Sequence, residues 1–372
     1  MPARLHIVTG KGGAGKTTVA AALAIALAAP DKRVLLVEVE GRQGIASLFG
    51  TAPLDYTELV LAESGPRGRV HALAIDPEAA LLEYLELFYK LGPAGRGLRK
   101  MGAIEFATTI APGIRDVLLT GKAYEAVRRR DARRQHVYDA VVMDAPPTGR
   151  IGSFLNINAE VEQLARVGPI HSQAASIMRV LRSPQTAVHF VALPEELPVQ
   201  ETADGIAAVH VLGLPVGAVV LNRTTTPRLS TPDLAAAAAG TLARDRVAAA
   251  LAATRPGANV RSPRAGGAAD DERTVDALLA MATDHARRVA TESRHRDELG
   301  ALGRPVIDLT RLPGGVDLAG LYGLADTLGG RLPDLLSGGD PRGADPTAAD
   351  PAAADARLSG PAADAPSARS AG

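Results

Sequence analysis

The sequence contains no cysteine among its 372 residues. This absence excludes disulfide bonds, thiolate metal sites, cysteine-ligated iron–sulfur clusters and cysteine nucleophiles. A net charge is absent as well, because 41 lysines and arginines balance 41 aspartates and glutamates. The balance provides no global attraction to nucleic acid or to an anionic membrane, although a local basic patch is compatible with it.

Long hydrophobic runs are also missing. No stretch approaches the roughly 20 consecutive apolar residues that a membrane-spanning helix requires. The first apolar run, "RLHIVT" at 4–9, leads directly into glycines instead of a cleavage site, which argues against a signal peptide. We therefore expect a soluble, cytoplasmic protein whose chain is long enough to bury a substantial core.

Short apolar runs recur between longer helical patterns. Most are continuously apolar, as expected for strands that are covered on both faces. Their alternation with helices predicts an α/β fold with a doubly wound, mostly parallel sheet. The runs are 4–9, 33–39, 69–75, 139–144, 187–193, 217–222 and 305–310.

The strand pattern disappears between residues 77 and 134. There the run "AALLEYLELFYKL" places Leu81, Leu85 and Phe88 on one helical face, with Leu82 and Tyr89 beside them. We interpret 77–134 as a helical subdomain inserted into a sheet domain. The sheet domain is formed by 1–76 and 135–336. A second helical stretch is expected at 151–182, and 151–185 is a candidate contributor to the helical subdomain.

The C-terminal third has helical patterns at 231–253 and 272–299. The stretch 255–271 between them contains glycine and proline and predicts a loop. From 337 to 372 the chain is rich in Ala, Pro, Asp and Gly and poor in large apolar residues. Such a segment buries too little surface to offset its ordering entropy, so the sequence predicts a disordered tail.

The segment "GKGGAGKT" at 10–17 fits the phosphate-loop pattern G-x-x-x-x-G-K-[ST], between a strand and a helical run. Its glycines let backbone N–H groups face phosphate oxygens, and the following helix adds its positive end. Lys16 is predicted to reach the β- and γ-phosphates of ATP, and the Thr17 hydroxyl to bind Mg²⁺. The alternative is a chance glycine-rich turn. The predicted nucleotide contacts in this loop are Gly12, Gly13, Ala14, Gly15, Lys16, Thr17 and Thr18.

Lys11 is a second lysine in a loop that needs only one. The backbone donors already occupy the phosphate-facing side, so Lys11 is expected to point outward. A second subunit placed face to face would receive this ammonium near its own γ-phosphate, as an arginine finger acts in trans. The alternative is an exposed lysine without a partner.

The segment "KGGAGKTT" resembles the deviant Walker A motif of dimeric ATPases that include the ParA/MinD proteins, the nitrogenase iron protein and the ArsA-type ATPases. The resemblance implies a P-loop NTPase fold and an ATP-dependent dimer. "VVMDAPPTGR" at 141–150 resembles the second switch of the ArsA-like branch, and its Pro-Thr-Gly favours that branch over ParA/MinD. The resemblance implies that Asp144 holds a Mg²⁺-bound water; the alternative is a turn with a capping aspartate.

The first switch departs from the family pattern. ArsA-like ATPases and the related tail-anchored-protein targeting ATPases carry Asp-Pro-Ala after the second strand, and the aspartate positions the attacking water. Here Glu40 and Gly41 occupy the first two of these positions. The longer side chain shifts the carboxylate, so hydrolysis is expected to be slow or altered in geometry. The alternative is that Glu40 only ends a strand.

Further segments resemble the same branch in the same order along the chain, and the resemblance spans about 4–328. They include "APGIRDVL" at 111–118 and "PEELPVQET" at 194–202, which implies Glu-Thr at a helix start. "VVLNR" implies that Asn222 reads adenine through its amide, with Arg223 beside it. "LTRLPGGVDLAGL" at 309–321 implies that Leu312 and Pro313 pack on the base.

The missing cysteines limit what the resemblance carries over. Arsenite held by thiolates is not expected, and neither is an intersubunit zinc clasp. Only one phosphate loop is present, so a dimer must supply a second site, as a homodimer or as a heterodimer with a paralogue. Joined helical subdomains would offer a groove for a client protein, although the periodic leucines also fit an ordinary core.

Two other functions remain open from the sequence. One is a ParA/MinD-like positioning ATPase acting on DNA or membrane, for which the cluster Arg128, Arg129, Arg130, Arg133 and Arg134 would be the basic surface; a solvated helix face explains it equally. The other is a subunit that binds ATP but hydrolyses it weakly.

Overall fold

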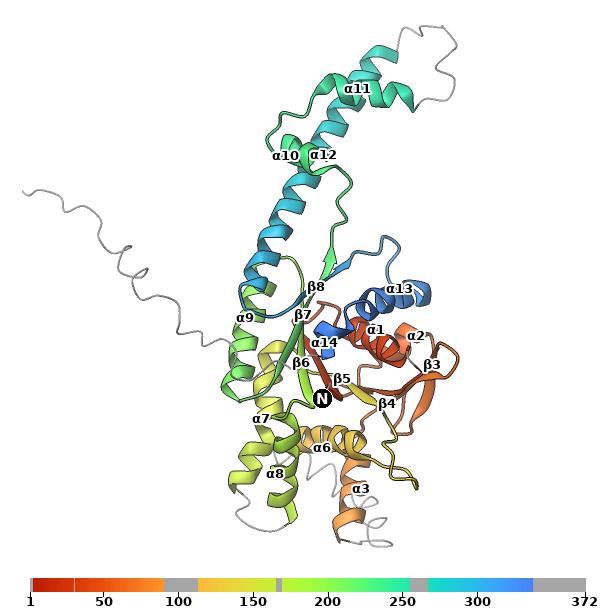
Figure 1. The fold of residues 1–372 in the computed structure, drawn as a ribbon, viewed down its shortest axis with the longest axis vertical. Helices are drawn as coiled ribbons and strands as arrows, with labels where there is room; N and C mark the ends of the chain where they lie inside the picture. Colours follow the sequence, from red (N-terminus) through yellow and green to blue (C-terminus); the bar gives the residue numbers. More distant parts are fainter. Residues whose placement is uncertain (1–2, 30, 90–112, 165–168, 255–266, 337–372) are drawn as a thin grey trace, which may run out of the picture. The chain divides into compact units, whose positions relative to one another are not determined.

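An eight-stranded sheet in the order β3-β4-β2-β5-β1-β6-β7-β8 forms the centre of the computed structural model (Figure 1). The structure describes residues 3–29, 31–89, 113–164, 169–254 and 267–336. All neighbouring strands are parallel except β3 and β4, which pair antiparallel at one edge. The strands are β1 (Leu5–Gly10), β2 (Arg33–Glu38), β3 (Leu59–Ser64), β4 (Gly68–Ala74), β5 (Ala140–Asp144), β6 (Thr186–Ala192), β7 (Val216–Thr224) and β8 (Val306–Thr310).

The central strands are apolar throughout because helices cover both faces of the sheet. Successive side chains of a strand point to opposite faces, so Ile7 enters one core and Val8 the other. The first core lies under α3 (Pro77–Tyr89), α6 (Ile114–Arg128), α7 (Thr148–Leu164), α8 (Pro169–Leu181) and α9 (Glu196–Val211). The second lies under α1 (Lys16–Ala28), α2 (Gly44–Phe49), α13 (Leu318–Gly329) and α14 (Leu332–Leu336). The predicted doubly wound α/β fold is confirmed.

α1 is buried almost all round because it packs against both the sheet and α13. Its alanines permit this close approach on both sides, while Val19, Leu23 and Ile25 fill the second core. The phosphate loop that precedes α1 is therefore attached to one of the most enclosed helices of the fold.

The sequence analysis did not predict β3. The side chains of "LVLAES" alternate between more exposed and more buried positions, as in an edge strand, and do not form the continuously buried run that was used to predict the other strands. The helix predicted over 231–253 is wrong in extent: it divides into α10 (Thr231–Ala238) and α11 (Arg244–Ala253). Gly240 lies at φ +70° after α10, and Thr241 N donates to Ala236 O at 2.8 Å, which is the Schellman pattern of a helix end.

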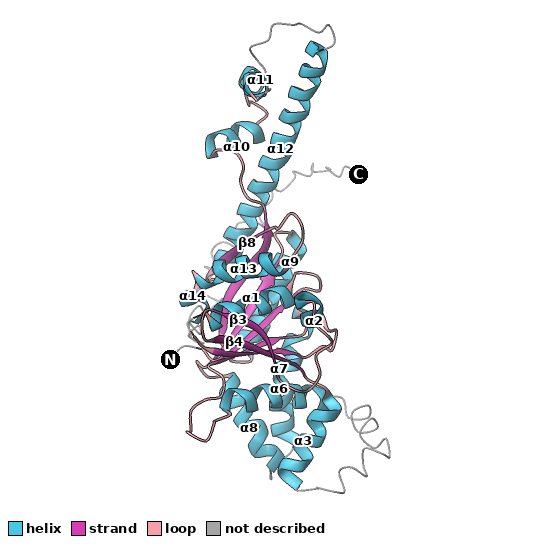
Figure 2. Ribbon diagram, turned by 90° about the vertical axis from the view of Figure 1, so that its right-hand side faces the viewer, coloured by secondary structure: helices cyan, strands magenta, loops and turns pink. Residues whose placement is uncertain are grey.

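The loop predicted over 255–271 is wrong at 267–271, since α12 (Gly267–Gly300) already begins at Gly267. α10 and α11 pack on α12 (Figure 2), which also contacts α9, β7 and β8. The predicted helix at 151–182 corresponds to α7 and α8. Residues 90–112 and the predicted tail at 337–372 lie outside the described part, as do the side chains of Leu85, Phe88 and Tyr89, whereas Leu81 packs on the first core. Among the described helices, none combines the length and apolar character that a bilayer crossing demands.

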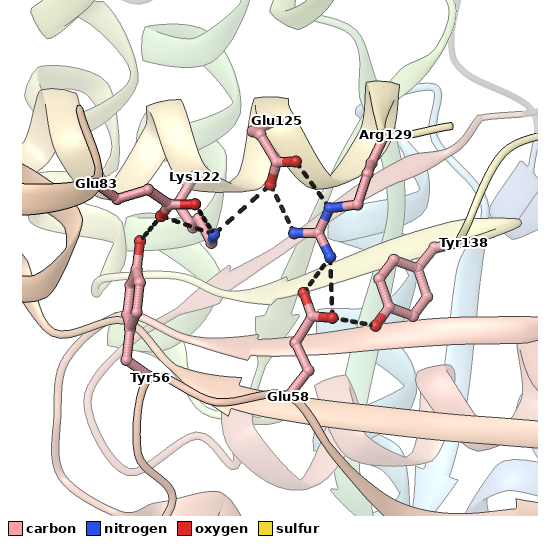
Figure 3. A network of polar contacts seen from close by, with 7 residues as sticks. All are labelled: Tyr56, Glu58, Glu83, Lys122, Glu125, Arg129 and Tyr138. Atoms are coloured by element: carbon pink, nitrogen blue, oxygen red, sulfur yellow. Dashed lines mark hydrogen bonds and ion pairs between the residues drawn. The ribbon is translucent and has the colours of Figure 1, made fainter. Parts of the chain in front are cut away.

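A polar network fastens α6 to the sheet (Figure 3). Arg129 donates two hydrogen bonds to Glu125 at 2.6–2.7 Å and two to Glu58 at 2.7–2.9 Å, and Tyr138 donates to Glu58 at 2.7 Å. On the other side of Glu125, Lys122 bonds Glu83 of α3, which also accepts from Tyr56. Burial and the bond to Glu58 raise the pKa of Tyr138, so it remains a donor at neutral pH. The network connects α3 and α6 to the segment that leads into β3.

Candidate functional site

The phosphate loop lies between β1 and α1 and has the backbone that its glycines permit. Gly13 and Gly15 have φ of +84° and +94°, in the left-handed region that favours glycine. A Cβ at Gly10 would overlap the carbonyl oxygen of Val191, and one at Gly15 would overlap the Asn222 amide. The loop sequence is therefore dictated by backbone conformation and by close neighbours on β6 and β7.

Thr17 and Asp144 meet at the start of α1. Asp144 is the last residue of β5, which pairs with β1, so its carboxylate reaches the helix start. Thr17 Oγ1 donates to Asp144 Oδ2 at 2.6 Å, while the buried Asp144 Oδ1 has no hydrogen-bond partner within the described residues. Lys16 is 8% exposed beside them.

The electrostatics of Asp144 are dominated by its burial. Burial raises the pKa of Asp144 to about 6; the Thr17 hydrogen bond and the Lys16 charge oppose the rise, whereas Glu38 and Glu40 add to it. A cation close to the free Oδ1 would favour the charged carboxylate. The Thr17 hydroxyl and this oxygen are hard oxygen ligands of the kind that Mg²⁺ binds together with phosphate oxygens and water. Within the described ranges no cluster of three or more His, Cys, Asp or Glu forms a ready-made metal cage.

Glu38 is a site residue that sequence reasoning missed. It ends β2, is 2% exposed, and accepts hydrogen bonds from the backbone N–H groups of Gln43 and Ile45. Its carboxylate thereby holds the turn that carries Glu40 and begins α2. The available signal was an acidic residue that closes an otherwise apolar strand.

A pocket of about 270 Å³ opens beside these groups. Glu40 reaches it and lies 3.8 Å from Arg42, its side chain 19% exposed. The pocket therefore brings together the predicted Lys16, Thr17, Glu40 and Asp144. Its lining consists of Gly13, Gly15, Lys16, Thr17, Glu38, Glu40, Arg42, Gly44, Asp144 and Arg223.

Lys11 does not line this pocket. Its ammonium donates to Glu201 Oε1 of α9 at 2.9 Å, and both side chains are about one-third exposed, at 32% and 37%. This contact lies within one chain, so the role of Lys11 toward a second subunit stays a prediction. Glu201 belongs to the Glu-Thr pair, which lies within α9 and not at its start as expected, because α9 begins at Glu196.

The predicted base-binding residues lie at the ends of β7 and β8. Asn222 is buried; its amide donates to Ala14 O at 2.8 Å and its oxygen accepts from Arg223 N at 2.9 Å. Arg223 is exposed at φ +60° and lines the phosphate-side pocket. Leu312 packs partly buried on the second core, Pro313 is exposed, and neither lines that pocket.

A family model described as anion-transporting ATPase matches residues 3–184, the stretch from β1 to α8 that contains the phosphate loop, Glu40 and Asp144. The ATPase BagA of Mycobacterium tuberculosis (strain ATCC 25618 / H37Rv) is 50% identical over 325 residues, which cover 87% of this chain and 92% of the relative.

Two relatives of lower sequence identity are also ATPases by name. A protein of Aquifex aeolicus (strain VF5) whose name contains "arsenical pump-driving ATPase 2" is 26% identical over 249 residues, 59% of this chain and 80% of the relative. The ATPase GET3 of Kluyveromyces lactis is 28% identical over 191 residues, 48% and 54% of the two chains. With its phosphate loop, its paired Thr17 and Asp144 and these similarities, the chain belongs to the anion-transporting ATPase family.

Proposed function

We propose that this chain is a cytoplasmic, Mg²⁺-dependent ATPase that forms a dimer when it binds ATP and opens it after hydrolysis. The observation that carries the proposal is the Thr17–Asp144 hydrogen bond at 2.6 Å beside the buried Lys16. A hydroxyl, a carboxylate with an unpaired oxygen and an ammonium at a helix start are the groups that hold a nucleotide triphosphate and its metal.

Thr17 and Asp144 would hold Mg²⁺, which supplies positive charge against the phosphate oxygens. Lys16 binds the β- and γ-phosphates from the loop side. The Glu40 carboxylate orients the attacking water, and its longer side chain makes turnover slow compared with an aspartate at the same position.

Lys11 acts on the nucleotide of a second subunit in this proposal. In the single chain it pairs with Glu201, a contact worth little because both groups are about one-third exposed. A γ-phosphate presented by a partner offers Lys11 more negative charge and therefore competes with Glu201. The partner is a second copy or a paralogous ATPase.

The helical insertion at 77–134 is proposed to transmit the nucleotide state to a partner or client protein. α7 begins at Thr148, four residues after Asp144, and packs on α6, α8 and α9. A shift of the loop after Asp144 would therefore move the first turn of a helix that touches the insertion. Adenine recognition by Asn222, Arg223, Leu312 and Pro313 completes the proposed nucleotide site.

Light scattering of the purified chain with ADP and with a slowly hydrolysed ATP analogue tests the dimer. We expect association with the analogue only, and Lys11→Ala to weaken it by at least about tenfold while nucleotide affinity changes little. Lys32→Ala, which removes an exposed lysine elsewhere, is the matched control. Equal association of Lys11→Ala and the native chain would overturn the role in trans.

Turnover separates the ATPase from a weakly hydrolysing subunit. Measured turnover of the native chain should rise in Glu40→Asp if the longer carboxylate limits water positioning. Absence of Mg²⁺-dependent turnover in both proteins, also after mixing with a paralogue, would contradict hydrolysis by this chain.

A further inference from the structure

A second concave site lies at the amino-terminal ends of β1, β5 and β6, opposite the strand ends that carry the phosphate loop. It encloses about 460 Å³. β1 has six residues, so about 20 Å of strand separates this edge from the phosphate loop. The two sites therefore do not overlap. The lining consists of Arg4, Arg128, Arg130, His136, Ser176, Arg179, Val180 and Gln185.

The site concentrates positive charge without a carboxylate in its lining. The arginines that have partners use neutral ones: Arg4 donates to the carbonyl of Tyr138 and bonds His136, and Arg130 donates to a backbone carbonyl. Arg179 has no side-chain hydrogen bond or ion pair to any residue that the structure describes. Four guanidinium groups thus share one cavity with their charges uncompensated by a lining acid.

Burial and the clustered positive charge lower the pKa values of two groups that line the pocket. The pKa of Arg4 is lowered by burial and by Arg130, although Asp139 opposes this. The pKa of His136 is lowered by burial and then by Arg4 and Arg130. The buried Nδ1 of His136 has no hydrogen-bond partner among the described residues. An anion in the cavity would relieve the repulsion and offer acceptors to these donors.

The basic run noted in the sequence is divided by the fold. Arg129 points into the network of Figure 3, where it pairs with Glu58 and Glu125. Arg128 and Arg130 line the cavity, while Arg133 and Arg134 are exposed outside its lining. The arginines therefore converge on a pocket and do not form the continuous strip that a nucleic-acid backbone requires.

We propose that this pocket binds a phosphate group carried by a free small molecule or by a lipid headgroup. Guanidinium forks match phosphate oxygens in pairs, and several forks around one cavity favour a doubly charged group over a carboxylate. Arg128 and Ser176 also line a separate groove of about 560 Å³ between α3, α6 and α8. A bound phosphate therefore ties the end of α6 to α8 and stiffens the insertion.

Calorimetric titration of inorganic pyrophosphate into the full chain saturated with Mg²⁺ and ADP tests the site. We expect one binding event, weakened at least about tenfold in Arg130→Gln/Arg179→Gln. Arg133→Gln/Arg134→Gln removes the same charge from neighbouring exposed positions and should change the affinity less than threefold. Thermal unfolding without pyrophosphate checks that both double variants fold. If Arg130→Gln/Arg179→Gln does not fold, the single variant Arg179→Gln takes its place in the titration.

Equal weakening in the two double variants would overturn the proposal, because it would show diffuse electrostatics. The absence of pyrophosphate binding would overturn it as well. Salt-sensitive retention of duplex DNA that depends on Arg133 and Arg134 would assign the surface to nucleic acid instead. Sedimentation with phosphatidic acid vesicles but not with phosphatidylcholine vesicles, lost in Arg130→Gln/Arg179→Gln, would support a lipid headgroup as the ligand. Binding of pyrophosphate without sedimentation on either vesicle would support a free phosphate compound.

Discussion

Asp144 is a buried carboxyl group, and burial disfavours its charged form unless a cation lies close to it. At the end of β5 the carboxylate accepts a hydrogen bond from Thr17, and in the proposed function it also faces Mg²⁺. Burial raises its pKa to about 6, so the folded chain without nucleotide holds this proton at higher pH than the unfolded chain does. The resulting destabilisation is absent below pH 4 and complete above pH 6.

Asp144→Asn should therefore stabilise the nucleotide-free chain at pH 8, by about 1–3 kcal/mol, and by much less at pH 4.5. The same variant should lose Mg²⁺-dependent turnover, since an amide is a poorer metal ligand. Urea unfolding at both pH values measures the difference. A pH-independent effect would contradict the assigned cause.

At the scale of an element, α2 and the turn before it depend on Glu38. Two backbone N–H groups, of Gln43 and Ile45, donate to its buried carboxylate. Glu40 stands two residues further and lines the pocket, where its Oε2 lies 3.8 Å from Arg42 Nε. Glu38 therefore fixes the turn, whereas Glu40 is the acid that we propose to face the phosphates.

Substitution of each acid should separate these roles. Glu38→Gln is expected to lower the free energy of unfolding by about 1–3 kcal/mol, because one buried N–H loses its acceptor. Glu40→Gln should change stability by less than about 0.5 kcal/mol and reduce turnover. Unfolding curves and ATPase rates of both variants provide the test, and reversed behaviour would show that the assignments are exchanged.

At the scale of the whole molecule, α6 is coupled to the sheet through the network around Arg129. Its partners Glu58 and Glu125 come from the segment before β3 and from α6, so one guanidinium joins the two parts. The helices α3 and α6 on one face of the sheet and α1, which follows the phosphate loop, on the other are therefore connected through the same sheet.

Arg129→Met should lower the free energy of unfolding by about 1–3 kcal/mol, because Glu58 and Glu125 lose a shared, partly buried cation. Arg67→Met, which removes an ion pair with Asp31 at an 82% exposed arginine, should cost less than about 0.5 kcal/mol. Urea unfolding of the two variants, with hydrogen exchange across α6, gives the comparison. Equal costs would mean that the network does not hold α6 against the sheet.

The sequence alone determined the doubly wound α/β class, the phosphate loop and the family, because continuous apolar strands, helical spacing and the glycine–lysine pattern are local properties. It missed β3, whose alternating pattern reflects an edge position, and the break at Gly240, which depends on one residue's φ. Only the tertiary structure decided that Lys11 meets Glu201, that Glu38 holds the turn before α2, and that Arg4, Arg130 and Arg179 share a cavity. These contacts join residues brought together by strand order and helix packing, which no local pattern in the chain encodes.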